Sequence, residues 1–146
     1  MSLRLNAAFK SMNLPRPGMP VPDLKRAGAP GPSGEPRLLI FATLHCADCI
    51  ALLPHLAPAA EVLSGYRMHL FMAGDPKEVR EVAEYFEWTF PIYPVSIREL
   101  HEGMGVQAYP FVLFDIGDGT IARAGTAHDV SEIISLSSGL LMRGGD

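Results

Sequence analysis

The sequence lacks the features that mark several common protein classes. Its apolar runs fall short of the roughly 18–20 residues that a transmembrane helix needs. The N-terminus has no central apolar block of the kind found in secretory signals. The 12 lysine and arginine residues are outnumbered by 16 acidic residues and form no cluster, which argues against nucleic acid as a partner. We therefore expect the chain as given to be soluble. If related proteins are tethered to a membrane, the tether is missing from this sequence.

Cysteine is also scarce, with only Cys46 and Cys49 in 146 residues. A disulfide between them would close a very short loop and stabilise the fold by roughly 2 kcal/mol, the low end of the scale. A structural zinc site needs four ligands, usually as two close pairs. The chain has no second C-x-x-C and no H-x-x-x-H spacing among its histidines. Neither a structural disulfide nor a metal site therefore explains this pair, and we expect no metal.

Proline and glycine are abundant and gather in the segment 14–36. Such a density excludes long regular structure. We therefore predict an N-terminal arm over residues 1–36, which would be a juxtamembrane segment if a tether precedes it. A short strand pair is expected near residues 21–28, and residues 3–12 form either a short amphipathic helix or a frayed terminus. One domain is expected to follow over residues 37–146.

Strand and helix patterns alternate after the arm. The apolar segment 37–44 predicts a strand buried on both faces. A second strand is expected over 66–74, and 111–125 predicts a hairpin that turns at Asp118-Gly119. Apolar periodicity predicts helices over 49–64, 75–88, 97–105 and 129–141. This order implies parallel strands first and antiparallel strands last, which is an α/β/α sandwich around a mixed central sheet.

Cys46 and Cys49 lie where the first predicted strand gives way to the first helix. A thiol at this position faces unpaired backbone N–H groups and the positive end of the helix dipole, and both stabilise the thiolate. A second cysteine in the same turn is within reach to resolve a mixed disulfide. C-x-x-C in this strand–helix context therefore predicts a redox couple. We expect Cys46 to attack and the more buried Cys49 to resolve.

Two proline positions agree with a redox site. Pro54 is expected to kink the helix and leave its first turn as a semi-independent platform. Tyr109-Pro110 precedes a predicted strand and is a candidate cis peptide bond that would hold an exposed backbone edge against the cysteines. Leu44, Tyr109 and Phe111 would add an apolar surface suited to an extended protein substrate.

The combination of Cys46-Ala-Asp-Cys49 after a buried strand, Pro54, and Tyr109-Pro110 before a hairpin resembles the thioredoxin superfamily. This resemblance implies a thioredoxin fold and dithiol–disulfide exchange with a protein substrate. It also implies that Cys46 is the nucleophile, that Cys49 is the resolving thiol, and that Pro110 is a cis-proline shaping the substrate groove.

Over residues 14–137 the chain looks most like the extracytoplasmic TlpA-like branch, which includes MauD-like proteins. The resemblance implies that electrons come from an upstream dithiol protein and that no organic or metal cofactor takes part. It also implies a place on the extracytoplasmic face of a bacterial membrane if a tether has been removed, and in the cytoplasm otherwise.

Three features depart from the thioredoxin pattern. His45 replaces the usual tryptophan before the first cysteine, and Ala47-Asp48 replaces Gly-Pro. Ile40 stands where thioredoxins carry a buried acid that helps to deprotonate the resolving thiol. Asp48 places negative charge beside both sulfurs and opposes thiolate formation, whereas His45 favours it only when protonated. We therefore expect a moderately reducing protein rather than a strong oxidant.

Two other functions stay open at this point. A thioredoxin-like copper chaperone would bind copper through Cys46, Cys49 and His128, which could approach the pair in the fold. A peroxiredoxin-type thiol peroxidase would use Cys46 in the T-x-x-C pattern that begins at Thr43, with Arg123 as the activating cation. Copper titration and consumption of hydrogen peroxide would separate these alternatives.

Overall fold

The computed structural model describes residues 14–140, and the helix predicted over residues 3–12 lies outside them. Its centre is a five-stranded sheet of order β3-β2-β1-β4-β5. The strands are β1 (Arg37–Thr43), β2 (Arg67–Ala73), β3 (Ile92–Val95), β4 (Phe111–Asp115) and β5 (Ile121–Thr126). β1, β2 and β3 run parallel to one another, while β4 runs antiparallel to β1 and to β5. The mixed sheet is as predicted, but β3 is absent from the sequence prediction.

The helical segments are short, and polar side chains cap the longer ones. They are η1 (Lys25–Ala27), α2 (Ala47–Leu52), η2 (Leu53–His55), α3 (Leu56–Val62), α4 (Pro76–Tyr85), η3 (Glu99–Gly103) and α5 (Val130–Ser137). The carboxylates of Asp75 and Asp129 accept backbone N–H bonds at the starts of α4 and α5. The predicted kink at Pro54 is confirmed, because the 3-10 turn η2 around this residue separates α2 from α3.

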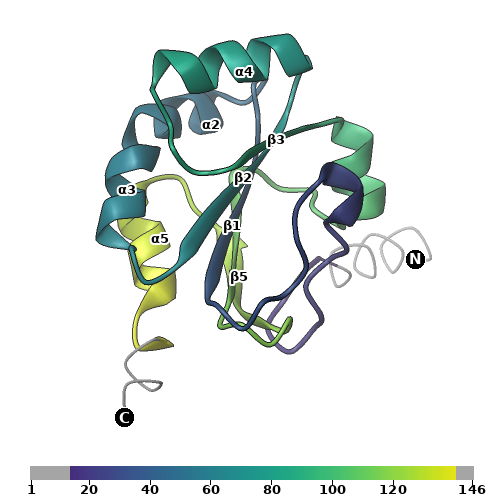
Figure 1. The fold of residues 1–146 in the computed structure, drawn as a ribbon, viewed down its shortest axis with the longest axis vertical. Helices are drawn as coiled ribbons and strands as arrows, with labels where there is room; N and C mark the ends of the chain where they lie inside the picture. The colour runs from purple at the N-terminus through teal and green to yellow at the C-terminus, as the bar shows by residue number, and fades with distance from the viewer. Residues whose placement is uncertain (1–13, 141–146) are drawn as a thin grey trace, which may run out of the picture.

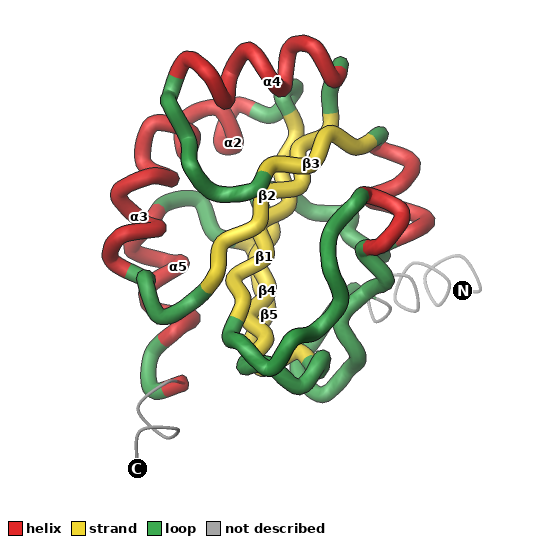
Figure 2. Tube along the Cα trace, viewed as in Figure 1, coloured by secondary structure: helices red, strands yellow, loops and turns green. Residues whose placement is uncertain are grey.

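The two faces of the sheet are covered differently (Figure 1). Residues of α2, α3, α4 and α5 join the core on one face, whereas η1, η3 and the arm cover the other. Figure 2 shows this contrast as helices on one side of the sheet and mostly loop on the other. Leu38 and Ile40 of β1 point into the helical face, and Leu39 and Phe41 point into the opposite one. β1 is therefore buried on both faces, as predicted, at the centre of the predicted sandwich.

The Pro/Gly-rich arm lies against the sheet over residues 14–36. Its segment 18–21 forms backbone hydrogen bonds with residues 119–121 at the start of β5, including a bridge between Pro20 and Thr120. The strand pair predicted near residues 21–28 is wrong. Backbone pairing of the arm with the sheet ends at Val21 and is followed by the 3-10 turn η1.

A buried ion pair ties the arm to the sheet at the end remote from the cysteines. Nε and Nη2 of Arg37 donate to Oδ2 of Asp115 at 3.1 and 2.7 Å, and Nη1 donates to the Pro30 carbonyl at 3.1 Å. The other carboxylate oxygen, Oδ1, accepts from the backbone N–H groups of Gly117 and Gly119. Because both charges are buried and hydrogen-bonded to each other and to the backbone, they hold the arm, β1 and the β4–β5 turn together.

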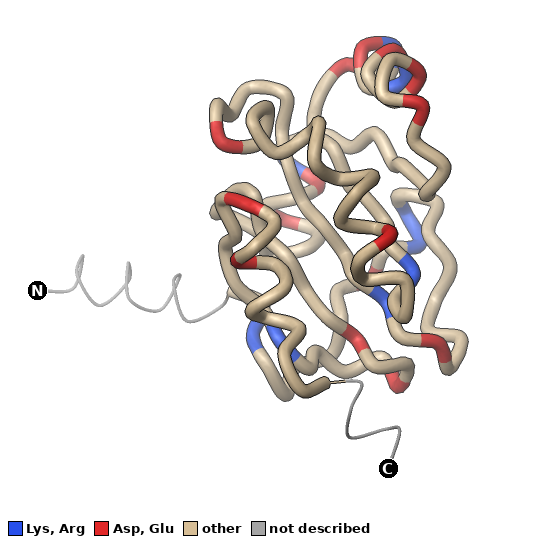
Figure 3. Tube along the Cα trace, turned by 90° about the vertical axis from the view of Figure 1, so that its left-hand side faces the viewer, with Lys and Arg blue, Asp and Glu red and all other residues tan. Residues whose placement is uncertain are grey.

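Charge on the outer surface is mixed. Figure 3 shows acidic and basic positions side by side on α4 and scattered elsewhere along the described chain. Among residues 14–140, no helix combines the length and apolar character that crossing a membrane requires.

Candidate functional site

Cys46 caps the N-terminus of α2 and binds the first turn through its sulfur. The backbone of Cys46 is extended, with φ −121° and ψ 122°, and the helix starts at the next residue. The backbone N–H of Cys49 donates to Cys46 Sγ at 3.3 Å. Both cysteines are free thiols, and the pair lies 3.0 Å apart. The predicted position of the pair in one helical turn is therefore what the structure has, and an N–H group points at the sulfur where a thiolate would form.

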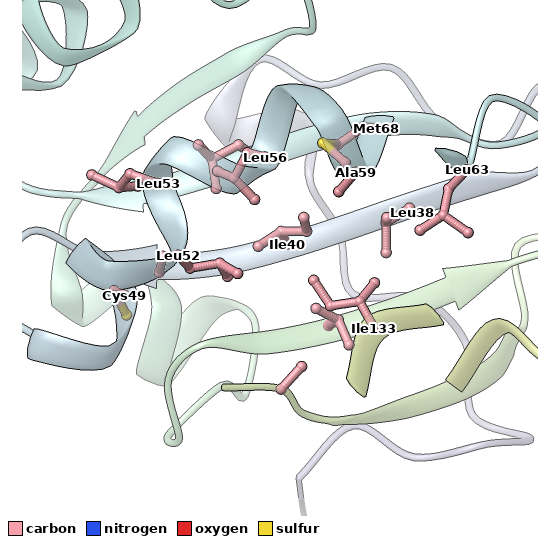
Figure 4. Packing of buried hydrophobic residues seen from close by; sticks show 14 of the residues in the cluster. Leu38, Ile40, Cys49, Leu52, Leu53, Leu56, Ala59, Leu63, Met68 and Ile133 are labelled. Atoms are coloured by element: carbon pink, nitrogen blue, oxygen red, sulfur yellow. The ribbon is translucent and has the colours of Figure 1, made fainter. Parts of the chain in front are cut away.

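The two thiols differ in burial. Cys46 is half-exposed, whereas Cys49 is 1% exposed at the end of the helix-side core, beside Leu52 (Figure 4). Burial raises the pKa of Cys49 to about 12, and its hydrogen bond with Cys46 and the negative charge of Asp48 act in the same direction. The Cys46 sulfur is thus accessible, whereas the Cys49 sulfur is buried and stays protonated at neutral pH.

The loop before β4 faces Cys46. The Tyr109–Pro110 peptide bond is cis, and the Cys46 thiol points at the Tyr109 carbonyl with 3.9 Å between Sγ and O. Pro110 is buried, and its own carbonyl accepts the backbone N–H of Ala127 at 3.0 Å. The carbonyl of Pro110 is therefore turned to the backbone of Ala127, and the backbone next to the sulfur is that of Tyr109.

The Tyr109 ring is fixed by two contacts that the sequence does not predict. Its hydroxyl donates to the Val106 carbonyl at 3.0 Å, and its ring stacks on His101 with 5.9 Å between centroids and 13° between planes. Burial raises the pKa of Tyr109 to about 12. His101 lies in η3, a π-helical turn, and no motif in the sequence marks it. Helices of this kind are often found at functional sites.

The apolar surface near the cysteines differs from the prediction at one position. Phe111 is 4% exposed and packs into the arm-side core, because it is the first residue of β4 and points to that face. Leu44 and Tyr109 are half-exposed, as the prediction requires. Ile50 on α2, which is 44% exposed, adds to the apolar surface in place of Phe111.

Asp48 meets a histidine from the loop between β5 and α5. His128 Nε2 lies 3.8 Å from Asp48 Oδ2, and His128 Nδ1 lies 3.3 Å from Glu132 Oε1. The backbone N–H of His128 also donates to Glu132 Oε1, at 2.7 Å. His128 therefore reaches the first turn of α2, but residues 14–140 contain no group of three or more His, Cys, Asp or Glu side chains able to hold a metal ion.

The structure does not bring Arg123 of the peroxidase alternative to the cysteines. Oγ1 of Thr43 accepts the backbone N–H of His45 at 3.2 Å, so this hydroxyl holds the turn that leads to Cys46. Arg123 pairs with Phe114 in the β4–β5 ladder, and Phe114 pairs with Leu38 near the start of β1. Arg123 therefore lies towards the opposite end of the sheet from the cysteines.

Comparison with known proteins shows the fold. No family model and no curated protein matches the sequence. A putative thioredoxin from Neisseria meningitidis superposes with a TM-score of 0.64 at 15% identity, over 90% of this chain and 91% of that chain. StoA from Bacillus subtilis gives 0.60 at 17% identity, over 73% and 84%. A secreted Mycobacterium tuberculosis disulfide oxidoreductase homologous to E. coli DsbE gives 0.58 at 20% identity, over 70% and 80%. The chain has the thioredoxin-like fold that its sequence predicts.

Proposed function

We propose that this protein is a thiol–disulfide oxidoreductase that exchanges the Cys46–Cys49 dithiol with a disulfide in a protein substrate. The observation that carries the proposal is the pair itself: a half-exposed sulfur that accepts an N–H bond in the first turn of α2, with a buried thiol 3.0 Å away. The similar solved structures include a putative thioredoxin and a disulfide oxidoreductase, which supports the same activity.

The reaction has two exchange steps. The Cys46 thiolate attacks the substrate disulfide, forms a mixed disulfide and releases one substrate thiolate. Cys49 then attacks Cys46 Sγ, which forms the Cys46–Cys49 disulfide and releases the second substrate thiolate. Two electrons thereby pass to the substrate, and an upstream dithiol protein restores the reduced pair. No cofactor is needed for either step.

The surroundings of the pair assist substrate docking. The backbone of Tyr109 lies beside Cys46 and can pair with an extended substrate segment, while Pro110 shapes the groove from below. The exposed side chains of His45 and Asp48 flank the sulfur, and the turn that carries them is held by Thr43. Pro54 ends α2 and leaves the cysteine turn as a short separate helix.

We also propose that the couple is moderately reducing. Asp48 lies in the first turn of α2, so its negative charge occupies the positive end of the helix that would otherwise stabilise a thiolate. A less stabilised thiolate makes the dithiol easier to oxidise, whereas strong oxidants owe their potential to a stabilised reduced form.

Two matched serine variants test the exchange activity, with insulin as the disulfide substrate and dithiothreitol as the electron source. We expect the wild-type protein to accelerate insulin reduction and both Cys46→Ser and Cys49→Ser to be inactive. Only Cys49→Ser is expected to form a covalent adduct with insulin, which mass spectrometry detects and excess dithiothreitol releases. No acceleration by the wild-type protein, or an adduct on the Cys46→Ser variant instead, would refute the proposal.

The site of action is a separate proposal. One similar solved structure is a secreted protein, and we propose that this chain also works on the extracytoplasmic side of a bacterial membrane, where its substrate and its dithiol donor would lie. Fractionation of the source cells is expected to recover it outside the cytoplasm, and recovery in the cytoplasmic fraction would contradict this location.

A further inference from the structure

The backbone that faces Cys46 lies in a loop without backbone hydrogen bonds of its own. Within residues 14–140, no backbone–backbone hydrogen bond involves residues 107–109, and the Tyr109 carbonyl meets only the Cys46 thiol, with 3.9 Å between Sγ and O. Free N–H and C=O groups at this place suit pairing with an extended substrate segment. The same freedom means that the position of the loop depends on the buried Pro110 that follows it and on the Tyr109 side chain.

The Tyr109 side chain is held by two contacts that act on different parts of its ring. Its hydroxyl donates to the Val106 carbonyl at 3.0 Å and restrains one end of the ring. The ring stacks on His101 of η3, with 5.9 Å between centroids and 13° between planes. The hydroxyl bond leaves the ring free to turn about its long axis, whereas the stack also sets the plane of the ring. The two contacts together therefore fix the ring, and through the ring they hold the backbone that faces Cys46.

The turn η3 gives His101 a fixed base. Its neighbour Leu100 is fully buried in the arm-side core, where Met104 and Val106 are also buried. The backbone N–H of Val106 donates to the Leu100 carbonyl at 2.8 Å, which ties the turn to the start of the loop. His101 itself is exposed, and its described partner is the Tyr109 ring. The core therefore has no need of the His101 side chain, which is placed to hold Tyr109 from the solvent side.

We infer that His101 is a positioning residue for substrate binding, which acts through Tyr109 and holds the backbone of residues 107–109 ready to pair with a substrate segment beside Cys46. This inference rests on the proposed exchange activity. A loop that is already held in the binding position loses less conformational freedom when the substrate docks. The stack therefore favours docking of a polypeptide and leaves the exchange between sulfur atoms unchanged. Because ring stacking carries the effect, a phenyl ring in place of the imidazole should serve as well.

Two substrates separate docking from the reactivity of Cys46. Insulin, reduced in the presence of dithiothreitol, presents a polypeptide segment to the loop, whereas Ellman's reagent is a small disulfide that needs no such pairing. We expect His101→Ala to raise KM for insulin about three- to tenfold, the range that a single aromatic pair supplies. The kcat for insulin and the rate of Ellman's reagent with Cys46 should be nearly unchanged, and His101→Phe should restore the wild-type KM. Glu102→Ala is the matched control and should match the wild type, because Glu102 is exposed in the same turn and pairs with Arg98.

Three results would overturn the role of His101. The first is an unchanged KM for insulin in His101→Ala, and the second is an equal rise of KM in His101→Phe. The third is a parallel loss of insulin reduction and of the Ellman reaction in His101→Ala, because it would mean that the substitution disturbs the cysteine turn and not docking. Failure of the wild-type protein to reduce insulin would instead overturn the exchange activity itself, and this inference with it.

Discussion

The burial of Cys49 predicts a large difference in reactivity between the native and the unfolded chain. Folding raises the pKa of this thiol from 9.0 to about 12. Because the thiolate is the form that reacts with alkylating agents, three pKa units correspond to about 10³ fewer reactive molecules at any pH well below 9. Restricted access to a side chain that is 1% exposed slows the reaction further. We therefore expect iodoacetamide to modify native Cys49 at least a thousandfold more slowly than the same residue in guanidinium chloride.

Timed alkylation followed by peptide mass spectrometry measures both cysteines in one sample. In the reduced native protein, Cys46 is expected to be modified completely before Cys49 is detectably modified, and the Cys49 rate should increase about tenfold for each pH unit. The guanidinium sample is the control, since both residues there should react alike. A native Cys49 rate within tenfold of the unfolded rate would refute the assigned burial and with it the roles of the two thiols.

Three further predictions concern stability. Asp115→Ala should lower the free energy of unfolding by about 3–5 kcal/mol, because it leaves the buried guanidinium of Arg37 without a partner. Glu35→Ala, which removes an exposed ion pair with Arg67, should change the free energy of unfolding by less than about 1 kcal/mol. Urea unfolding measures both variants, and equal losses for Asp115→Ala and Glu35→Ala would contradict the prediction. Phe114→Ala removes a fully buried ring and should cost about 3–5 kcal/mol in the same measurement, so a loss below about 1 kcal/mol would contradict its burial. The reduced protein should lose stability as pH rises from 9.0 towards 12, because the unfolded state ionises Cys49 and the folded state does not. A Cys49→Ala control should show a smaller loss, which the raised pKa of Tyr109 still causes above pH 10.0, and an identical pH dependence in both proteins would exclude Cys49 as a source.

The features that the sequence predicts well depend on neighbouring residues. The change from a continuous apolar run to a helical pattern places Cys46 at the junction of β1 and α2, which is where the structure has it. Asp75-Pro76 at the start of α4 is equally local, since a capping carboxylate and a proline in the first turn both favour a helix start. The Asp118-Gly119 turn between β4 and β5 is also predicted from neighbouring residues alone.

The features that the sequence misses depend on distant contacts or on short elements. β3 is four residues long, contains Pro94 and lies at the sheet edge, so it has too little pattern to predict. The approach of His128 to the cysteine pair is expected from the sequence, but its contact with Asp48 is not. That contact joins α2 to the loop between β5 and α5 and becomes visible only when these elements are placed. The burial of Phe111 follows from the face to which the first residue of β4 points, which depends on the register of that strand.

The most direct test of the account is the redox equilibrium of the purified protein in glutathione buffers, with mass spectrometry of each state. The account predicts one reversible intramolecular disulfide between Cys46 and Cys49, with a reduction potential nearer to about −270 mV, the value of thioredoxin, than to about −120 mV, the value of a strong oxidant. A potential near the oxidant value would contradict the proposed direction. Failure of the two thiols to form that bond under any buffer ratio would contradict the exchange activity itself.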